Sequence, residues 1–215
     1  MAIYDTEEEQ LEGLKRWWKE NGTSTVVGIA IGIAIIVGWN YWQEHKKDQA
    51  NQASAIYDQL LKAAETDQKD SADKLAKRLQ EQFTGTSYAA YGGLFQAKFK
   101  AQAGDIAAAK EILKKIADGS DKELSHIAKI RLVKLMLASG EYEQGLQVIN
   151  DVDQSEAAKF SDNYDELVGD LYVALDRLDE ARTAYQKALK NGYQSPLLQL
   201  KIDDLTAPEK IETKK

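Results

Sequence analysis

The sequence contains no cysteine, which excludes disulfide bonds, thiolate catalysis and zinc sites built on thiolates. It contains only two prolines, Pro196 and Pro208, while alanine, leucine, lysine, glutamate and glutamine are abundant, a composition typical of helices. Basic residues are outnumbered, because 28 Lys and Arg face 35 Asp and Glu, giving a formal net charge of −7. Phosphate contacts require a basic face, so we expect no nucleic-acid partner.

Charged residues are also absent from residues 21–43, between Glu20 and Glu44. As an α-helix this stretch would span roughly 35 Å, and the hydrocarbon core of a bilayer is about 30 Å thick. A cleaved signal peptide is the alternative. The preceding tail is acidic rather than basic, however, and the apolar run is longer than usual for a signal peptide. The stretch therefore predicts a transmembrane helix that anchors the rest of the chain.

Aromatic residues flank this stretch on both sides, where the headgroup layers of a bilayer favour them. Trp17 and Trp18 precede it, and Trp39, Tyr41 and Trp42 close it. Basic residues are equally frequent on the two flanks, so the positive-inside rule gives no orientation. A short N-terminal tail is easily kept in the cytoplasm, whereas a long C-terminal domain can be translocated. On that ground alone we expect a cytoplasmic N-terminus.

Three glycines lie within residues 26–38, the most apolar part of this stretch. Gly28 and Gly32 have the spacing of a small-residue pair that lets two membrane helices approach, and Gly38 follows them. We predict that these glycines contact a partner's membrane helix. The alternative is that they are the small residues common in any membrane span.

The remainder of the chain repeats at an interval of 36 residues. Segments 102–116, 138–152 and 174–188 align without gaps. Residues of similar size or similar role recur at the aligned positions. A turn position holds Gly104, Gly140 and Asp176, a position for a small side chain holds Ala109, Gly145 and Ala181, and a position for a large side chain holds Leu113, Ile149 and Tyr185. A glycine can end one helix in a left-handed conformation, and a small residue lets two helices approach closely.

This pattern resembles the tetratricopeptide repeat, most clearly at Gly169, Tyr172, Ala181, Tyr185 and Ala188. The period is two residues longer than is usual in that family, and the family's initial tryptophan is missing. The resemblance implies antiparallel helix pairs that stack into an α-solenoid. No glycine or proline interrupts residues 39–64, so the first helix after the membrane can continue out of the span.

The predicted fold class is therefore all-α, with one N-terminal transmembrane helix followed by a tetratricopeptide-repeat-like α-solenoid and a C-terminal capping helix. The predicted parts are residues 1–20, a cytoplasmic tail with a short amphipathic helix; 21–43, the transmembrane helix; 44–87, a membrane-proximal helix pair; 88–206, the repeats with their cap; and 207–215, a flexible tail.

Motifs for catalysis are missing. The two histidines are His45, at the predicted membrane edge, and His126, which lies beside Ile127 and Ile130 with no nucleophile held to it by any motif. The sequence has no phosphate-binding glycine loop and no G-x-S-x-G. We expect no enzyme, no cofactor, no metal site and no small-molecule substrate.

A binding surface is expected instead, because the first helix of each stacked pair lines a concave groove in the family that the repeat resembles. The groove positions that this resemblance implies are Tyr91, Leu94, Lys98, Ile127, Ile130, Lys134, Glu166 and Asp170. Such a groove would be partly apolar, basic near Lys98 and Lys134, and acidic near Asp170. We hypothesise that it binds extended polypeptide; the alternative is that these residues are solvated lysines and core isoleucines.

Four landmarks follow one another along the chain. They are the aromatic pair before Glu20-Asn21-Gly22, the G-W-x-Y-W end of the span at residues 38–42, the stretch 86–91, and K-I-D-D-L at residues 201–205. In this order they resemble the YfgM-type ancillary subunits of the Sec translocon, which are single-pass bacterial inner-membrane proteins.

That resemblance implies a cytoplasmic N-terminus and a periplasmic C-terminal domain. It also implies three partners: the translocon channel, a membrane-anchored periplasmic chaperone, and newly translocated polypeptides that pass to periplasmic chaperones. An influence on an envelope stress response is implied as well. The alternative is a membrane-anchored scaffold for envelope or division machinery that binds no client.

Overall fold

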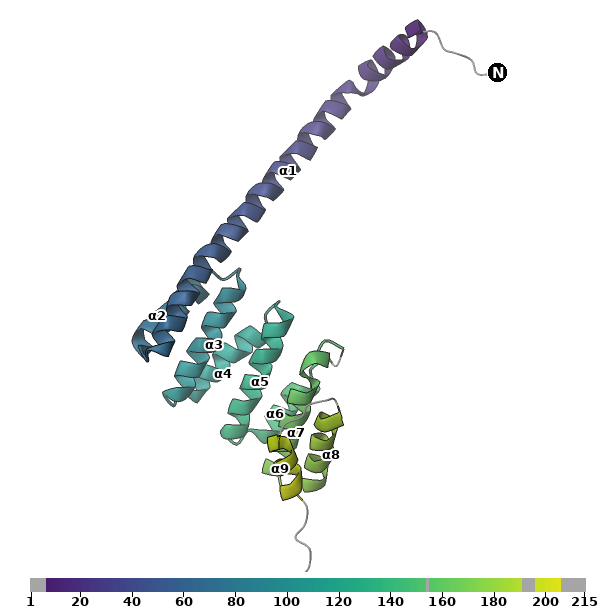
Figure 1. Ribbon diagram of the computed structural model, residues 1–215. Helices are drawn as coiled ribbons and strands as arrows, with labels where there is room; N and C mark the ends of the chain where they lie inside the picture. Colours follow the sequence, from purple (N-terminus) through teal and green to yellow (C-terminus); the bar gives the residue numbers. More distant parts are fainter. Residues whose placement is uncertain (1–6, 154, 191–195, 206–215) are drawn as a thin grey trace, which may run out of the picture. The chain divides into compact units, whose positions relative to one another are not determined.

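Every element in the part of the chain that the computed structural model describes, residues 7–153, 155–190 and 196–205, is helical (Figure 1). The helices are α1 (Glu7–Glu65), α2 (Lys69–Gln82), α3 (Ser87–Gln102), α4 (Ile106–Ala117), α5 (Lys122–Ala138), α6 (Tyr142–Asn150), the 3-10 helix η1 (Ala158–Phe160), α7 (Ser161–Ala174), α8 (Leu178–Lys190) and α9 (Pro196–Asp204). The all-α fold class is confirmed. Residues 1–6 of the predicted N-terminal tail and the predicted flexible tail, 207–215, lie outside the described residues.

The chain divides into two compact units, residues 1–52 and residues 53–215. In the first unit, the described residues form part of α1, and the apolar side chains from Val26 to Val37 are exposed, Ile35 by 65%. By length and composition, α1 is the one described helix able to cross a membrane. Water does not tolerate an unbroken apolar surface of this kind, whereas lipid does.

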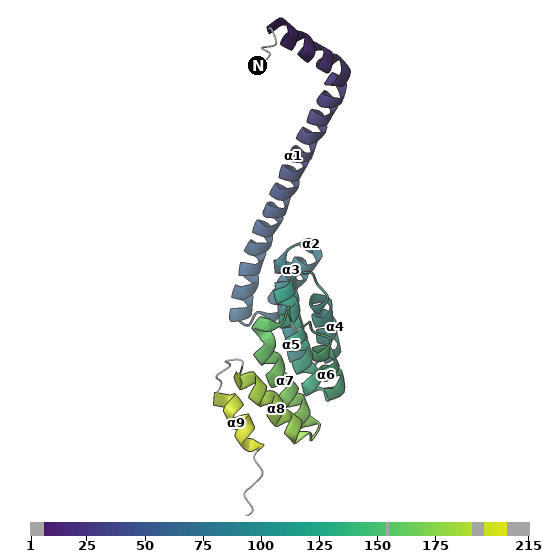
Figure 2. The same cartoon turned by 90° about the vertical axis from the view of Figure 1, so that its right-hand side faces the viewer.

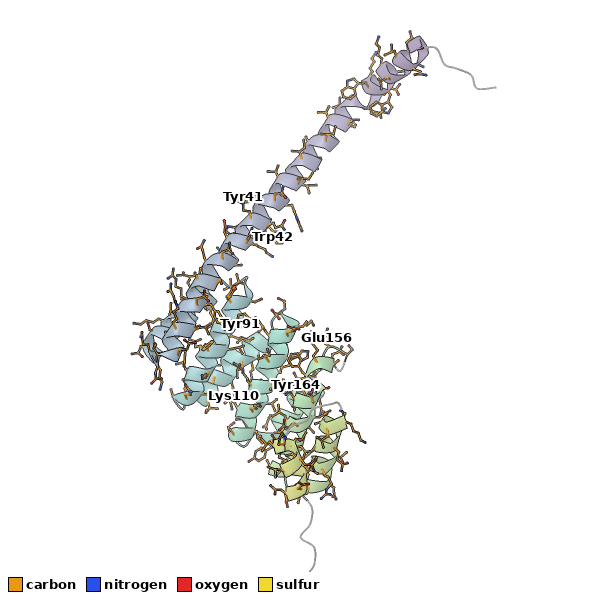
Figure 3. All side chains as sticks on the ribbon, in the orientation of Figure 1. Tyr41, Trp42, Tyr91, Lys110, Glu156 and Tyr164 are labelled. Atoms are coloured by element: carbon orange, nitrogen blue, oxygen red, sulfur yellow. The ribbon has the colours of Figure 1, made fainter. Side chains whose placement is uncertain are left out.

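The two ends of the apolar stretch carry their aromatic side chains on the helix surface. The rings of Trp39 and Trp42 lie 5.2 Å apart, and the ammonium of Lys46 lies 4.0 Å from the Trp42 ring centre, a cation–π contact (Figure 3). At the other end, the Thr25 hydroxyl donates a hydrogen bond to the Asn21 carbonyl at 2.9 Å. That bond satisfies the hydroxyl within the helix, as burial in lipid requires.

The second unit begins with a helix pair made by residues 53–65 of α1 and by α2. Its core contains Ile56 and Leu60 of α1 against Ala76 and Leu79 of α2. The helix runs to Glu65 without a break, which confirms the prediction that it continues beyond the apolar stretch. Asp67 then turns the chain in a left-handed conformation, with φ 55°.

The following helices alternate between two layers. Figures 1 and 2 show α3, α5 and α7 in one layer and α4 and α6 in the other. The turns within the pairs use the three residues spaced by 36: Gly104 has φ 83°, Gly140 has φ 80° and Asp176 has φ 60°. All three are left-handed, which confirms that the sequence repeat is a structural repeat.

The small and large positions of the repeat meet in the cores of the pairs. Ala109 and Ala181 are completely buried, and Tyr185 is 2% exposed. A Cβ atom added at Gly169 of α7 would overlap the ring of Tyr185 on α8. The tight approach of α7 and α8 therefore depends on the missing side chain of Gly169.

We predict that Gly169→Ala destabilises the chain by about 1–3 kcal/mol, because the added methyl group overpacks this contact. Denaturant unfolding of the full chain in detergent measures the change. Gly85→Ala is the matched control, since a Cβ there meets no atom within 4 Å. Equal stability of the two variants would contradict the packing assigned to Gly169.

Candidate functional site

Five aromatic rings form a cluster on the end of α1 and on α3. The Tyr57 ring centre lies 5.4 Å from that of Tyr91, 5.6 Å from Tyr88 and 6.1 Å from Phe95, and Phe99 lies 6.1 Å beyond Phe95. All five rings are half-buried. The rings of this aromatic cluster, which includes Tyr91 in Figure 3, pack against the hydrophobic core on one side and keep part of their surface accessible.

Two adjoining cavities of about 320 and 330 Å³ open between α3 and α5 beside the aromatic cluster. They share Leu94, Lys98 and Arg131, so they form one feature, which we call the α3–α5 cleft. The other residues lining it are Tyr57, Tyr91, Phe95, Ala97, Ala101, Leu113, Leu124, Ile127, Lys134 and Leu135.

The charged residues that line the α3–α5 cleft are cations. They are Lys98, Arg131 and Lys134, and no carboxylate of the part of the chain that the structure describes joins them. Among the described residues, none of these three cations forms an ion pair. Burial and the neighbouring tyrosines raise the pKa of the Tyr57 hydroxyl, so this group stays a neutral hydrogen-bond donor at the cleft wall.

The cleft brings together five of the residues that the sequence placed in the groove: Tyr91, Leu94, Lys98, Ile127 and Lys134. Leu94 is 5% exposed and also belongs to the core between α3, α4 and α5. Ile130 does not line the cleft. It packs against the core cluster that joins α5 to α6 and α7, so the alternative reading as a core isoleucine applies to it.

The two acidic groove positions, Glu166 and Asp170 of α7, do not line the cleft. Their carboxylates share one cation. The ammonium of Lys201 on α9 donates hydrogen bonds at 2.7 Å to both, and the Tyr185 hydroxyl donates one to Asp170 at 2.7 Å. Burial alone would lower the pKa of Lys201, but these hydrogen bonds raise it above its usual value. The capping helix thus supplies one cation to the acidic end expected from the sequence, which balances one of its two negative charges.

Tyr57 and Arg131 line the cleft although neither is among the groove positions predicted from the sequence. Tyr57 belongs to the first helix pair, which does not align with the 36-residue repeat. It precedes Tyr91 by 34 residues, however, and this is the usual period of tetratricopeptide repeats. Arg131 lies one turn before Lys134 on α5, and residues at this spacing share a helix face. Either spacing could have identified the residue.

His126 is a packed core residue of α5. Its Nδ1 atom shares a 2.9 Å hydrogen bond with the Tyr164 hydroxyl, and its ring stacks on Phe160 at 5.1 Å. Burial lowers the pKa of His126 and raises the pKa of Tyr164 to about 12. Both groups are therefore neutral at pH 7, and their partners are each other rather than a nucleophile.

The surface beside Gly28, Gly32 and Gly38 is open. A Cβ atom at Gly28, Gly32 or Gly38 would meet no atom within 4 Å. A partner helix could therefore approach them, and their contact with one stays a prediction.

Comparison with known proteins assigns the chain to a family. The sequence model described as a tetratricopeptide repeat-like domain matches residues 15–207. The chain is 29% identical to a protein of Haemophilus influenzae over 208 residues and 30% identical to one of Aggregatibacter actinomycetemcomitans, in each case over 95% of this chain and 100% of the relative. It is 27% identical to an Escherichia coli protein over 96% of this chain and 100% of the relative. All three are named ancillary SecYEG translocon subunit.

A solved structure supports the fold. The chain named MamA MSR-1 C2 superposes with a TM-score of 0.50, covering 72% of this chain and 84% of that one. Its sequence identity is 15%, so the likeness concerns the fold alone.

We predict that the free energy of unfolding falls as the pH drops below about 6.5, because the unfolded chain then protonates His126 while the folded chain holds it neutral. His126→Asn keeps a polar partner for the Tyr164 hydroxyl but cannot take up this proton, so it should lose that part of the pH dependence. Urea unfolding of both forms in detergent between about pH 7.5 and pH 5.5 measures the difference. The same pH dependence in both forms would contradict the assignment.

Proposed function

The chain belongs to the tetratricopeptide-repeat-like family of ancillary SecYEG translocon subunits, and from this premise we propose how it works. It is a non-enzymatic membrane protein of the bacterial inner membrane that associates with the SecYEG channel. Its N-terminus lies in the cytoplasm and its repeat domain in the periplasm. There the repeat domain holds newly translocated polypeptides and passes them to a membrane-anchored periplasmic chaperone. An influence on an envelope stress response would follow from failed delivery.

The observation that carries polypeptide binding is the α3–α5 cleft with its aromatic cluster. Extended chains present side chains and backbone amides without a fixed shape, and half-buried rings can contact many such side chains. The hydroxyl of Tyr57 supplies a donor beside these rings. A repeat domain serving only as a rigid scaffold has no need of an open aromatic cleft beside unpaired cations.

The first unit supports the membrane anchor. Its apolar side chains are exposed along more than two turns on every side of α1, and aromatic residues border them at both ends. Burial of such a surface in lipid gains about 25 cal/mol for each Å² removed from water. The open glycines Gly28, Gly32 and Gly38 leave room for a helix of the channel or of the chaperone.

The proposed topology can be tested through the absence of cysteine, since a single introduced thiol is the only one in the chain. We predict that Ser71→Cys on α2 reacts with a membrane-impermeant maleimide in intact spheroplasts. Gly13→Cys, at an exposed position before the apolar stretch, should react only after lysis. The opposite pattern would overturn the orientation and leave the anchor in place.

Polypeptide binding is tested by placing a photoreactive residue at Ile127, which lines the cleft. We predict that it forms adducts with arrested, newly translocated chains in membranes. The same residue at Lys74, exposed on α2 outside the cleft, is the control and should give few such adducts. Adducts from Ile127 that contain folded partners only would favour the scaffold and contradict client binding.

A further inference from the structure

The α3–α5 cleft combines aromatic rings around one of its cavities with three cations around the other, and this combination points to a preferred sequence in the bound chain. We propose that the cleft selects extended segments in which an acidic side chain lies a few residues from an aromatic or large aliphatic one. The inference rests on the proposed function, because it names the class of polypeptide that the same site takes.

The rings of the cleft gather around one of its two cavities. Tyr57, Tyr91, Phe95 and Ile127 line the cavity of about 330 Å³ together with Leu94 and Leu124, and this cavity shares Lys98 and Arg131 with the other one. A large apolar side chain placed there removes its surface and that of the rings from water. Full burial of such a side chain is worth roughly 1.5–3 kcal/mol, and partial burial proportionately less.

All three cations lie around the other cavity. Lys98, Arg131 and Lys134 line the cavity of about 320 Å³, whose other walls are leucine and alanine side chains. The protein carries a formal net charge of −7, yet no carboxylate lines this cavity. Three neighbouring cations repel one another, so an incoming carboxylate would be attracted to them and lower that repulsion. Charge complementarity therefore identifies the second group of the ligand as an acid.

The repeat sets the distance between the apolar and the basic side chains of the cleft. On α3, Tyr91 and Lys98 lie two turns apart, and on α5 the equivalent residues Ile127 and Lys134 repeat the same arrangement. Two turns of helix correspond to about 10 Å along the axis. An extended chain advances about 3.3 Å per residue, so it crosses this distance in about three residues.

A basic side chain in the bound segment would meet the opposite situation. It would add a fourth positive charge beside Lys98, Arg131 and Lys134, with no acid in the cleft to balance it. Selection against basic segments is thus as much a part of the proposal as selection for acidic ones.

The test measures binding of three fluorescent peptides to the full chain in nanodiscs of zwitterionic lipid. The peptides are identical except that, three positions after a single phenylalanine, they carry Glu, Gln or Lys. We expect the Glu peptide to bind roughly three- to tenfold more tightly than the Gln peptide, and the Lys peptide to bind most weakly. The advantage of the Glu peptide should shrink as salt is raised.

The double variant Lys98→Glu with Lys134→Glu should reverse the order of the Glu and Lys peptides. Both lysines are exposed, so the variant should fold. Lys74→Glu makes the same kind of charge change on the exposed surface of α2 and should keep the original order. Reversal in the double variant alone would support the assignment of the acid to the cleft.

Three results would overturn the inference. They differ in whether they also contradict polypeptide binding by the cleft. Equal binding of the three peptides would remove the acid preference and leave polypeptide binding intact. An acid preference that survives in the double variant would place the acid outside the cleft. No binding of any peptide would contradict the proposed function itself.

Discussion

The close approach of the two helices in each pair is the constraint on which the repeat domain depends. It requires a small residue where the helices cross, as at Ala109 and Ala181, and a left-handed turn between them, as at Gly104 and Gly140. Asp176 takes the same left-handed conformation without being a glycine, which costs free energy that the surrounding packing must offset. Where the approach is closest, the ring of Tyr185 occupies the place of a side chain at Gly169.

This packing determines which residues remain for binding. Within each pair the small and large positions are buried in the core. The packing of the pair therefore does not determine which residues occupy the exposed positions of α3 and α5. In the first two repeats they place Lys98 and Lys134 at equivalent positions around open space. In the third repeat Asp170 stands at that position, and Lys201 of α9 forms ion pairs with it and with Glu166. The same scaffold thus forms an open basic cleft at one place and a closed ion-pair network at another.

The fold was predictable from the sequence because its constraints are local and periodic. The turn residues, the small positions and the uncharged stretch can each be recognised from spacing alone. The site was predictable in part: Lys98 and Lys134 follow the period, and the cleft contains them. Arg131 and Tyr57 are not among the positions that the 36-residue repeat marks, and only their spacings to Lys134 and to Tyr91 could have identified them. Lys201 could not be assigned, because a single contact between the capping helix and α7 leaves no periodic trace.

A cleft of this kind suits a protein that must release what it binds. In the proposed function its ligand contacts would be a few half-buried rings and three solvent-exposed cations, and such contacts give modest affinity and fast dissociation. Attachment to the membrane would compensate, since a site confined near the channel would meet each emerging chain at a high effective concentration. A deeper, fully apolar pocket would bind more tightly and delay transfer to the next chaperone. Weak, charge-selective contacts held at the membrane therefore fit a transfer role better than a storage role.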